Sequence, residues 1–312
     1  MASPMLEEQE ILAARPAKNA VSWFEPYAYM VEPELTAAAV VEDVATIFLT
    51  NRECPFRCVM CDLWKNTTDE TPPVGAIPTQ IEFALARLPE VTHVKLYNSG
   101  NFFDSRAIPV ADHQAIADRV RSCQTVIVEN HPKLCGDVCA QFRQRVAGRL
   151  EVALGLETAH PAVLAQLNKQ MTVEDFQSAS RFLVDCDIDV RTFILLQPPF
   201  MNSVESVDWC VRSVETAFAA GSACCAIIPT RGGNGAMETL AAERRFQPPS
   251  LDQLEEALDR SLELRGGRVF VDLWDVHRLA NCDLCRDQRI ERLRRANLQQ
   301  RQLPRVDCQC RK

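Results

Sequence analysis

The sequence lacks any long hydrophobic segment. Among its 312 residues, no apolar run approaches the roughly 20 residues that a membrane-spanning helix needs. The first residues (MASPMLEEQE) contain no basic patch followed by an apolar stretch, so we expect no secretory signal. Internal repeats and low-complexity tracts are also absent. The absence of a long apolar run and of a secretory signal predicts a cytoplasmic protein that has no membrane partner.

Positive charge is also scarce, with 34 Lys and Arg residues against 42 Asp and Glu residues. The formal net charge of −8 argues against a protein whose whole surface binds nucleic acid. The C-terminal segment is the exception. Residues 286–312 contain nine basic and three acidic residues and carry +6, whereas the preceding 285 residues carry −14. Such a basic tail predicts either a local contact with phosphate groups or an ordinary solvated helical surface.

Hydrophobic residues make up 47% and charged residues 24% of the chain, the proportions of an ordinary globular protein. Short apolar runs, typical of strands buried on both faces of a parallel sheet, alternate with helical patterns. The predicted strands are 44–50, 91–97, 125–129, 150–156, 190–196, 223–228 and 268–273. The predicted helices are 79–88, 111–122, 136–147, 173–185, 204–220 and 251–264, and the basic tail is expected to be mostly helical.

This alternation, repeated about six times, predicts an α/β fold of the partial (β/α)6 barrel type. Capping sequences support two helix starts, because Thr172 is followed by Asp175 and Ser250 by Gln253, each three residues on. We expect an extended N-terminal lead-in (1–43), a barrel core (44–265) and a small basic, cysteine-rich C-terminal extension (266–312).

Cysteine is abundant, with 14 residues. In a cytoplasmic protein these thiols stay reduced, so they serve as metal ligands, reactive groups or small buried side chains. Cys54, Cys58 and Cys61 directly follow the first predicted strand, at the edge where barrel enzymes place their active sites. Three thiolates can hold three irons of a [4Fe-4S] cluster and leave the fourth iron open. Alternatively, this spacing places three buried side chains on one helix face.

The C-x3-C-x2-C pattern after the first strand of a six-unit βα barrel resembles the radical S-adenosylmethionine (SAM) superfamily, over residues 44 to about 265. The resemblance implies that the open iron binds the amino and carboxylate groups of SAM. It also implies that an electron from the cluster cleaves the sulfonium bond to give methionine and a 5′-deoxyadenosyl radical. The protein would orient this cofactor and exclude water.

The same resemblance implies further contacts with SAM at the strand ends. Glu157, after the fourth predicted strand, is expected to meet the ribose or the amino group. The turn 98–104 lacks the usual Gly-Gly-Glu sequence, so only backbone contacts are expected there. Met60 replaces the usual aromatic residue but is still apolar. The predicted cofactor-binding residues are Cys54, Cys58, Met60, Cys61, Ser99, Gly100, Glu157, Gln197 and Ile228.

The end of the third predicted strand supplies two candidate catalytic residues, Glu129 and His131, which are expected to face a substrate. A histidine in this position is also common as an ordinary loop residue. Glu157 also has an alternative interpretation, an ordinary solvated acid in a loop that does not contact SAM.

A second group of thiols lies near the basic tail. Cys282 and Cys285, followed by Cys308 and Cys310, fit a four-thiolate site that ties the tail back on itself. Zinc and an auxiliary iron–sulfur cluster both suit these ligands, and a site without metal is the third alternative. The remaining cysteines are expected to be buried thiols; they are Cys123, Cys135, Cys139, Cys186, Cys210, Cys224 and Cys225.

Several strings resemble one branch of the superfamily, the radical SAM proteins of archaeosine biosynthesis, close to the elongator-type and methylthiotransferase-type enzymes. They are residues 44–54, 61–66, 98–100 and 195–200, together with the C-terminal cysteines. The branch implies cleavage of the lysine C–N bond on a lysine-modified deazaguanine in tRNA. It also implies a one-electron donor of the ferredoxin or flavodoxin type and a lysine-transferring tRNA synthase as partners.

Two other functions are compatible with the residues. A radical SAM enzyme that acts on a small molecule or a peptide would keep the same core cysteines. A non-enzymatic zinc-binding interaction protein would use both cysteine groups structurally.

Overall fold

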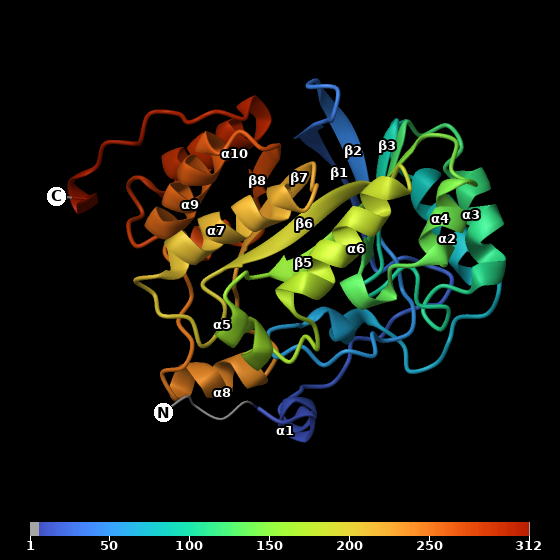
Figure 1. The fold of residues 1–312 in the computed structure, drawn as a ribbon, viewed down its shortest axis with the longest axis horizontal. Helices are drawn as coiled ribbons and strands as arrows, with labels where there is room; N and C mark the ends of the chain where they lie inside the picture. Colours follow the sequence, from blue (N-terminus) through green and yellow to red (C-terminus); the bar gives the residue numbers. More distant parts are fainter. Residues whose placement is uncertain (1–5, 312) are drawn as a thin grey trace.

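The computed structural model describes residues 6–311 and has one sheet of eight strands curled into part of a barrel (Figure 1). The strands lie in chain order across the sheet. The first pair is antiparallel and every later pair is parallel. The strands are β1 (Ala28–Leu35), β2 (Val41–Phe48), β3 (His93–Tyr97), β4 (Thr125–Asn130), β5 (Arg149–Glu157), β6 (Asp189–Leu196), β7 (Cys224–Pro229) and β8 (Arg268–Val271). Lys312 of the basic tail lies outside the described residues, as do residues 1–5.

Helices cover the outer face of the sheet, where Figure 1 shows α6, α7 and α9 packed along β5 to β7. The α-helices are α1 (Glu8–Ala13), α2 (Ala76–Leu85), α3 (His113–Arg119), α4 (Asp137–Arg143), α5 (Pro161–Gln166), α6 (Val173–Asp185), α7 (Ser206–Ala219), α8 (Ala236–Ala242), α9 (Leu251–Glu263) and α10 (Arg286–Gln299). Shorter 3-10 helices are Leu63–Asn66, Val110–Asp112, Pro132–Leu134, Val276–Leu279 and Gln309–Arg311. Within residues 6–311, no helix is both long and apolar enough to span a bilayer.

The α/β partial-barrel prediction is confirmed, and all seven predicted strands are present with shifts of a few residues at their ends. The side chains of Thr172 and Ser250 accept hydrogen bonds from the backbone N–H groups of Asp175 and Gln253, as their capping sequences predict. The extended lead-in predicted for residues 1–43 is wrong in part, because this segment contains α1 and β1. β1 carries Pro33 and no fully buried residue, so it lacks the apolar pattern that reveals an inner strand.

The concave face of the sheet is filled by side chains at its amino-terminal half. Glu34 of β1 pairs with Arg191 of β6 at 2.6 Å and with Lys95 of β3, and Glu151 of β5 bonds Arg191 from the other side. Above this ion network, the rings of Tyr97 (β3) and Phe193 (β6) lie with centroids 6.0 Å apart. Two strands separate β3 from β6, so this contact crosses the concave face. The open part of the barrel is therefore at the carboxyl ends of the strands.

Side chains of α10 cover the outer edge of β8. The amide of Asn297 pairs with the N–H and the carbonyl of Val271, both at 2.9 Å. The amide of Gln300 pairs with the same groups of Val269 at 2.6 and 2.8 Å. These two amides satisfy backbone groups that an edge strand otherwise leaves open to another chain.

Two arginines of the basic tail are used inside the molecule. Arg289 and Arg292 on α10 are buried, and they pair with Glu255 (2.9 Å) and Asp259 (2.8 Å) of α9. The prediction of a tail whose charge faces solvent or phosphate is therefore wrong for these two residues, since acidic side chains of α9 take up their charge. The sequence pattern missed this because the acids lie more than 30 residues upstream.

Candidate functional site

The loop that carries Cys54, Cys58 and Cys61 leaves the carboxyl end of β2 and is held at both ends. At its start, the buried Gln80 accepts from the N–H of Thr50 (2.7 Å) and donates to the carbonyl of Thr50 (2.8 Å). At its end, the indole of Trp64 and the amide of Asn234 donate to the carbonyl of Cys61 at 3.0 and 3.1 Å. These bonds fix the loop by its backbone, so the thiols are free to bind a ligand.

The three thiols lie near one another at the barrel mouth and are half-buried. Burial raises the pKa of all three, that of Cys58 to about 11, and the nearby charge of Lys169 works in the opposite direction on Cys54 and Cys58. The neutral thiol is therefore favoured until a cation replaces the proton.

Asn101 ties Cys54 to the neighbouring strands. Its side-chain amide donates to the sulfur of Cys54 over 3.0 Å, and its amide oxygen accepts from the N–H of His131 at 2.8 Å. The second bond fixes which way the amide points, so a hydrogen-bond donor faces the sulfur. Asn101 is 2% exposed, and water does not compete for these bonds.

His131, predicted to face a substrate, instead supports the loop. Its Nδ1 accepts from the N–H of Lys133 (3.1 Å), its Nε2 lies 3.0 Å from the carbonyl of Lys169, and its ring stacks on Phe56 with centroids 3.7 Å apart. Burial lowers the pKa of His131 to about 3, so the imidazole is neutral. Both ring nitrogens are occupied, which leaves neither for acid–base chemistry.

Glu129, the other catalytic candidate, holds the turn that follows β3. Its Oε1 accepts from the backbone N–H of Asn98 (2.7 Å) and from that of Gly100 (3.3 Å). Burial raises its pKa to about 7, and the backbone donors oppose this rise. The turn is also fixed by the hydroxyl of Tyr27, 2.8 Å from the hydroxyl of Ser99. The structure therefore brings Glu129 and the predicted backbone contacts at 99 and 100 into one unit.

Glu157 lies at the carboxyl end of β5 in an ion pair that the sequence analysis did not find. Its Oε1 lies 2.7 Å from the ammonium group of Lys169, and both residues are buried. Burial alone would lower the pKa of Lys169, but Glu157 and Cys58 outweigh it and raise the pKa. Lys169 thus places a positive charge between Glu157 and the thiol loop.

The other predicted contacts lie around the same mouth. Gln197 follows β6, is 3% exposed and donates to the carbonyl of Met201 at 3.1 Å. Ile228 lies beside Leu195 in the β6–β7 register. Met60 packs against the apolar cluster formed by Val59 and side chains of α8. Gln197 and Ile228 lie at the carboxyl ends of neighbouring strands and Met60 lies in the thiol loop, and their contacts with a cofactor stay predictions.

The site has features that fit a bound polar cofactor. Three thiols converge on a loop beside the positive charge of Lys169, the donor set that an iron–sulfur cluster takes. Asn98, in the adjacent turn, is fully buried, yet both side-chain amide atoms have no hydrogen-bond partner. A buried amide without partners is costly, and a polar ligand at this turn would satisfy it.

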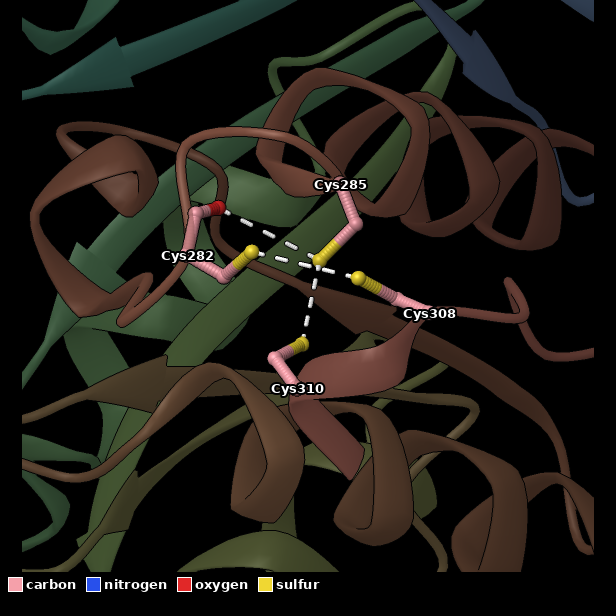
Figure 2. Close-up of side chains that lie close together, drawn as sticks. All are labelled: Cys282, Cys285, Cys308 and Cys310. Atoms are coloured by element: carbon pink, nitrogen blue, oxygen red, sulfur yellow. Dashed lines mark hydrogen bonds between the residues drawn. The ribbon is translucent and has the colours of Figure 1, made fainter. Parts of the chain in front are cut away.

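A second candidate metal centre lies at the C-terminal end. Figure 2 shows the side chains of Cys282, Cys285, Cys308 and Cys310 pointing toward one another. Their sulfurs all lie within 4.8 Å of one another, with 3.9 Å between Cys282 and Cys308 and 3.7 Å between Cys285 and Cys310. Backbone N–H groups of Cys285 and Leu284 lower the pKa of Cys282 to about 7, which favours a thiolate.

The spacing of these sulfurs fits one metal ion. Four thiolates around a tetrahedral zinc at about 2.3 Å have sulfurs about 3.8 Å apart. Ligands of a [4Fe-4S] cluster bind separate irons, which puts their sulfurs about 6 Å apart. Of the residues that the structure describes, only these four cysteines form a group close enough to share a single ion. The thiols at 54, 58 and 61 are not such a group, although they influence one another's pKa.

No family model matches the chain, but curated relatives and solved structures do. An uncharacterized protein of Methanocaldococcus jannaschii is 22% identical over 310 residues, covering 92% of this chain and 85% of that protein. The archaeosine synthase subunit beta of Methanosarcina acetivorans is 24% identical over 268 residues, covering 81% of this chain and 77% of that protein. The chain thus resembles these relatives over most of its length.

Solved structures identify the fold. A radical SAM methyltransferase from Sphaerobacter thermophilus aligns with a TM-score of 0.52 at 12% identity, over 79% of this chain and 76% of that one. The chain has the radical SAM fold. The archaeal Elp3 of Methanocaldococcus infernus aligns with a TM-score of 0.54 at 16% identity. The alignment covers 82% of this chain and 63% of the Elp3 chain.

Within the radical SAM fold, three positioning residues escaped the sequence analysis. Lys169 lies in a loop 12 residues after its partner Glu157, and Tyr27 lies more than 70 residues before Ser99. Asn101 is close to the predicted turn contacts but carries no motif of its own. No local pattern marks such residues, since their roles come from tertiary contacts.

Proposed function

We propose that this protein is a radical SAM enzyme that modifies a nucleoside of tRNA. Cys54, Cys58 and Cys61 would hold a [4Fe-4S] cluster, and SAM would lie over the strand ends between the 98–101 turn and Gln197. When bound, the cluster supplies the electron that cleaves the sulfonium bond of SAM and produces the 5′-deoxyadenosyl radical. The observation that carries this proposal is the convergence of three backbone-anchored thiols at the carboxyl edge of a radical SAM fold.

The chain's own residues would bind and orient these groups. The side-chain amide of Asn101 donates to the sulfur of Cys54 and would stabilise negative charge there. The ammonium group of Lys169 balances part of the charge of the thiolates. Glu157, held by Lys169, would present its second carboxylate oxygen to the ribose or the amino group of SAM. Glu129 would keep the turn at 98–100 in place for backbone contacts with SAM.

The similarity to archaeosine synthase subunit beta supports the substrate class. The reaction would cleave the lysine C–N bond on a lysine-modified deazaguanine in tRNA, leaving the formamidine of archaeosine. Its partners would be a lysine-transferring tRNA synthase and a ferredoxin- or flavodoxin-type electron donor. Mass spectrometry of tRNA nucleosides, after incubating the enzyme with lysine-modified tRNA, SAM and dithionite, tests this assignment. Persistence of the lysine-modified nucleoside while 5′-deoxyadenosine accumulates would contradict it.

We propose zinc as the occupant of the four-cysteine site, because its sulfur spacing suits one tetrahedral ion. Cys308→Ser should lower zinc content by one per chain and leave iron unchanged, as measured by elemental analysis of the anaerobically reconstituted protein. Cys186→Ser, outside both thiol groups, is the control and should keep both metals. Loss of iron instead of zinc in Cys308→Ser would assign the site to a second cluster.

The core proposal is tested with Cys58→Ala and the control Cys186→Ala. Removing one of three cluster ligands should abolish 5′-deoxyadenosine formation and the iron–sulfur absorbance, because the cluster then loses a thiolate. The Cys58 side chain contributes little buried surface, so the fold should survive its removal. The barrel should keep its circular dichroism spectrum. Full turnover by Cys58→Ala, or a wild-type protein that takes up zinc but no iron, would contradict the assignment.

A further inference from the structure

A cavity of about 510 Å³ opens at the carboxyl edge of β6, beside the candidate site. Its wall comes from the segment after β6, from the last residue of α5 and from the link between α8 and α9. All these segments follow carboxyl ends of strands, and in Figure 1 α5 and α8 lie on the same side of the molecule. The cavity therefore belongs to the edge that carries the thiol loop.

The charge of this cavity is positive. Two arginines line it, Arg244 and Arg245, and no Asp or Glu is among the lining residues. Arg245 pairs with the nearby Glu243 at 3.0 Å and lies over the ring of Phe200. Arg244 is exposed, and among residues 6–311 no acidic side chain forms an ion pair with it. In a chain of net charge −8, such a cavity suits an anionic group.

The remaining wall is suited to the hydroxyl groups of a sugar. Gln166, Asn202 and Gln247 are among the lining residues. Gln166 already donates to the carbonyl of Ala162 (3.3 Å) and Asn202 accepts from the N–H of Val204 (3.1 Å), and an amide has further donor and acceptor positions beyond these. Phe200 contributes part of the apolar surface. A cation and several amides together match the phosphate and hydroxyl groups of a nucleotide.

The cavity shares a wall with the thiol loop. Phe246 is buried against Val59 in one apolar cluster, and Met60 and Phe200 pack against that cluster. Gln197 of the cavity wall is also a predicted SAM contact. A ligand in the cavity would thus lie beside the place where the radical forms.

We propose that this cavity binds the phosphate of a nucleotide, with Arg244 as the charged contact. The inference rests on the proposed function, and it places the substrate on the β6 side of the mouth. The phosphate could belong to a tRNA backbone or to a free nucleotide, and both present the same group to an arginine.

Arg244→Ala tests the proposal, with Arg265→Ala as a matched control. Both arginines are exposed, and both have a positive φ, 58° and 52°. Arg265 lies between α9 and β8, at the amino end of β8, whereas the cavity lies at the carboxyl ends of the strands. Fluorescence anisotropy with an unmodified tRNA transcript and the full-length, reconstituted protein should show about fivefold weaker binding for Arg244→Ala and a salt slope lower by about one. Arg265→Ala should match the wild type.

Three further outcomes are decisive. Equal affinity of the two variants for both the transcript and GMP overturns the proposal, because a specific phosphate contact must distinguish them. Weaker binding of SAM to Arg244→Ala also overturns it, since the cavity would then belong to the cofactor. If Arg244→Ala weakens binding of GMP but not of the transcript, the phosphate is that of a free nucleotide, which supports the assigned chemistry. Formation of 5′-deoxyadenosine by the same wild-type preparation tests the proposed function separately.

Discussion

At the scale of single residues, the hydrogen bond from Asn101 to Cys54 connects the turn after β3 with the thiol loop. The amide of Asn101 is neutral, but the positive end of its N–H dipole faces the sulfur. That sulfur would become more negative when a bound cluster is reduced. Hydrogen bonds to cluster sulfurs raise the reduction potential for this reason. If Cys54 holds a cluster as proposed, Asn101 would therefore adjust how readily an electron enters it.

Asn101→Ala should lower the midpoint potential of the reconstituted cluster. One such hydrogen bond contributes roughly 1 kcal/mol, or about 40 mV for a one-electron couple. An EPR-monitored redox titration measures the shift. Gln114→Ala is the control, because Gln114 lies on α3 and its amide donates to Asp118 (3.2 Å). An unchanged potential in Asn101→Ala would show that the bond does not act on the cluster.

The role of a residue such as Asn101 cannot be predicted from the sequence, because it depends on contacts that form only in the folded chain. Cys54, Cys58 and Cys61 could be predicted because one short segment contains them all and the chemistry requires thiols. His131 and Glu129 could be placed at a strand end, but their roles depend on partners from other loops. His131 is occupied by Lys133 and Lys169, and only the folded chain shows this.

At the scale of elements, α10 acts as a substitute for a ninth strand. Asn297→Ala should leave the N–H and carbonyl of Val271 without partners and lower the free energy of unfolding by about 1–3 kcal/mol. Urea denaturation of the protein measures the loss. Gln299→Ala, on the same helix but exposed, should change stability by less than about 0.5 kcal/mol. Equal stability of the two variants would contradict the role given to Asn297.

The inner elements were predictable and the peripheral ones were not. Strands β2 to β8 contain short apolar runs because most of their side chains are buried, and α6 and α9 begin with capping boxes. β1 lacks an apolar run because it is a half-buried edge strand, and α8 has only seven residues, too short for a clear helical pattern. Their positions follow from tertiary packing against β2 and against Val59.

At the scale of the whole molecule, the ion network inside the barrel makes stability depend on pH. Burial would raise the pKa of Glu34, but Arg191 and Lys95 outweigh it and hold the pKa well below its ordinary value. Since the folded pKa is lower than the unfolded one, the stabilisation is complete above about pH 4.5 and is lost as the pH falls further. The free energy of unfolding should therefore fall in acid, and the loss should begin where the ion network joins the amino-terminal halves of the parallel strands.

Glu34→Gln should lower the free energy of unfolding at pH 7 by about 3–5 kcal/mol, because it leaves buried positive charge without its partner. The variant should also lose less stability than the wild type between pH 5 and pH 3. Urea denaturation at several pH values measures both effects. Glu32→Gln, exposed on the same strand, is the control. A wild-type acid dependence retained in full by Glu34→Gln would assign it to other carboxyl groups.

The cover that α10 places over β8 has a consequence for how the chain is made. Synthesis proceeds from the N-terminus, so the ribosome releases β8 before the helix whose amides complete its backbone pairing. During that interval the newborn sheet carries an uncovered border, the kind of surface to which a second nascent chain can add. A released chain that ends between residues 272 and 285 should therefore aggregate, whereas a chain that ends after Gln300 should not.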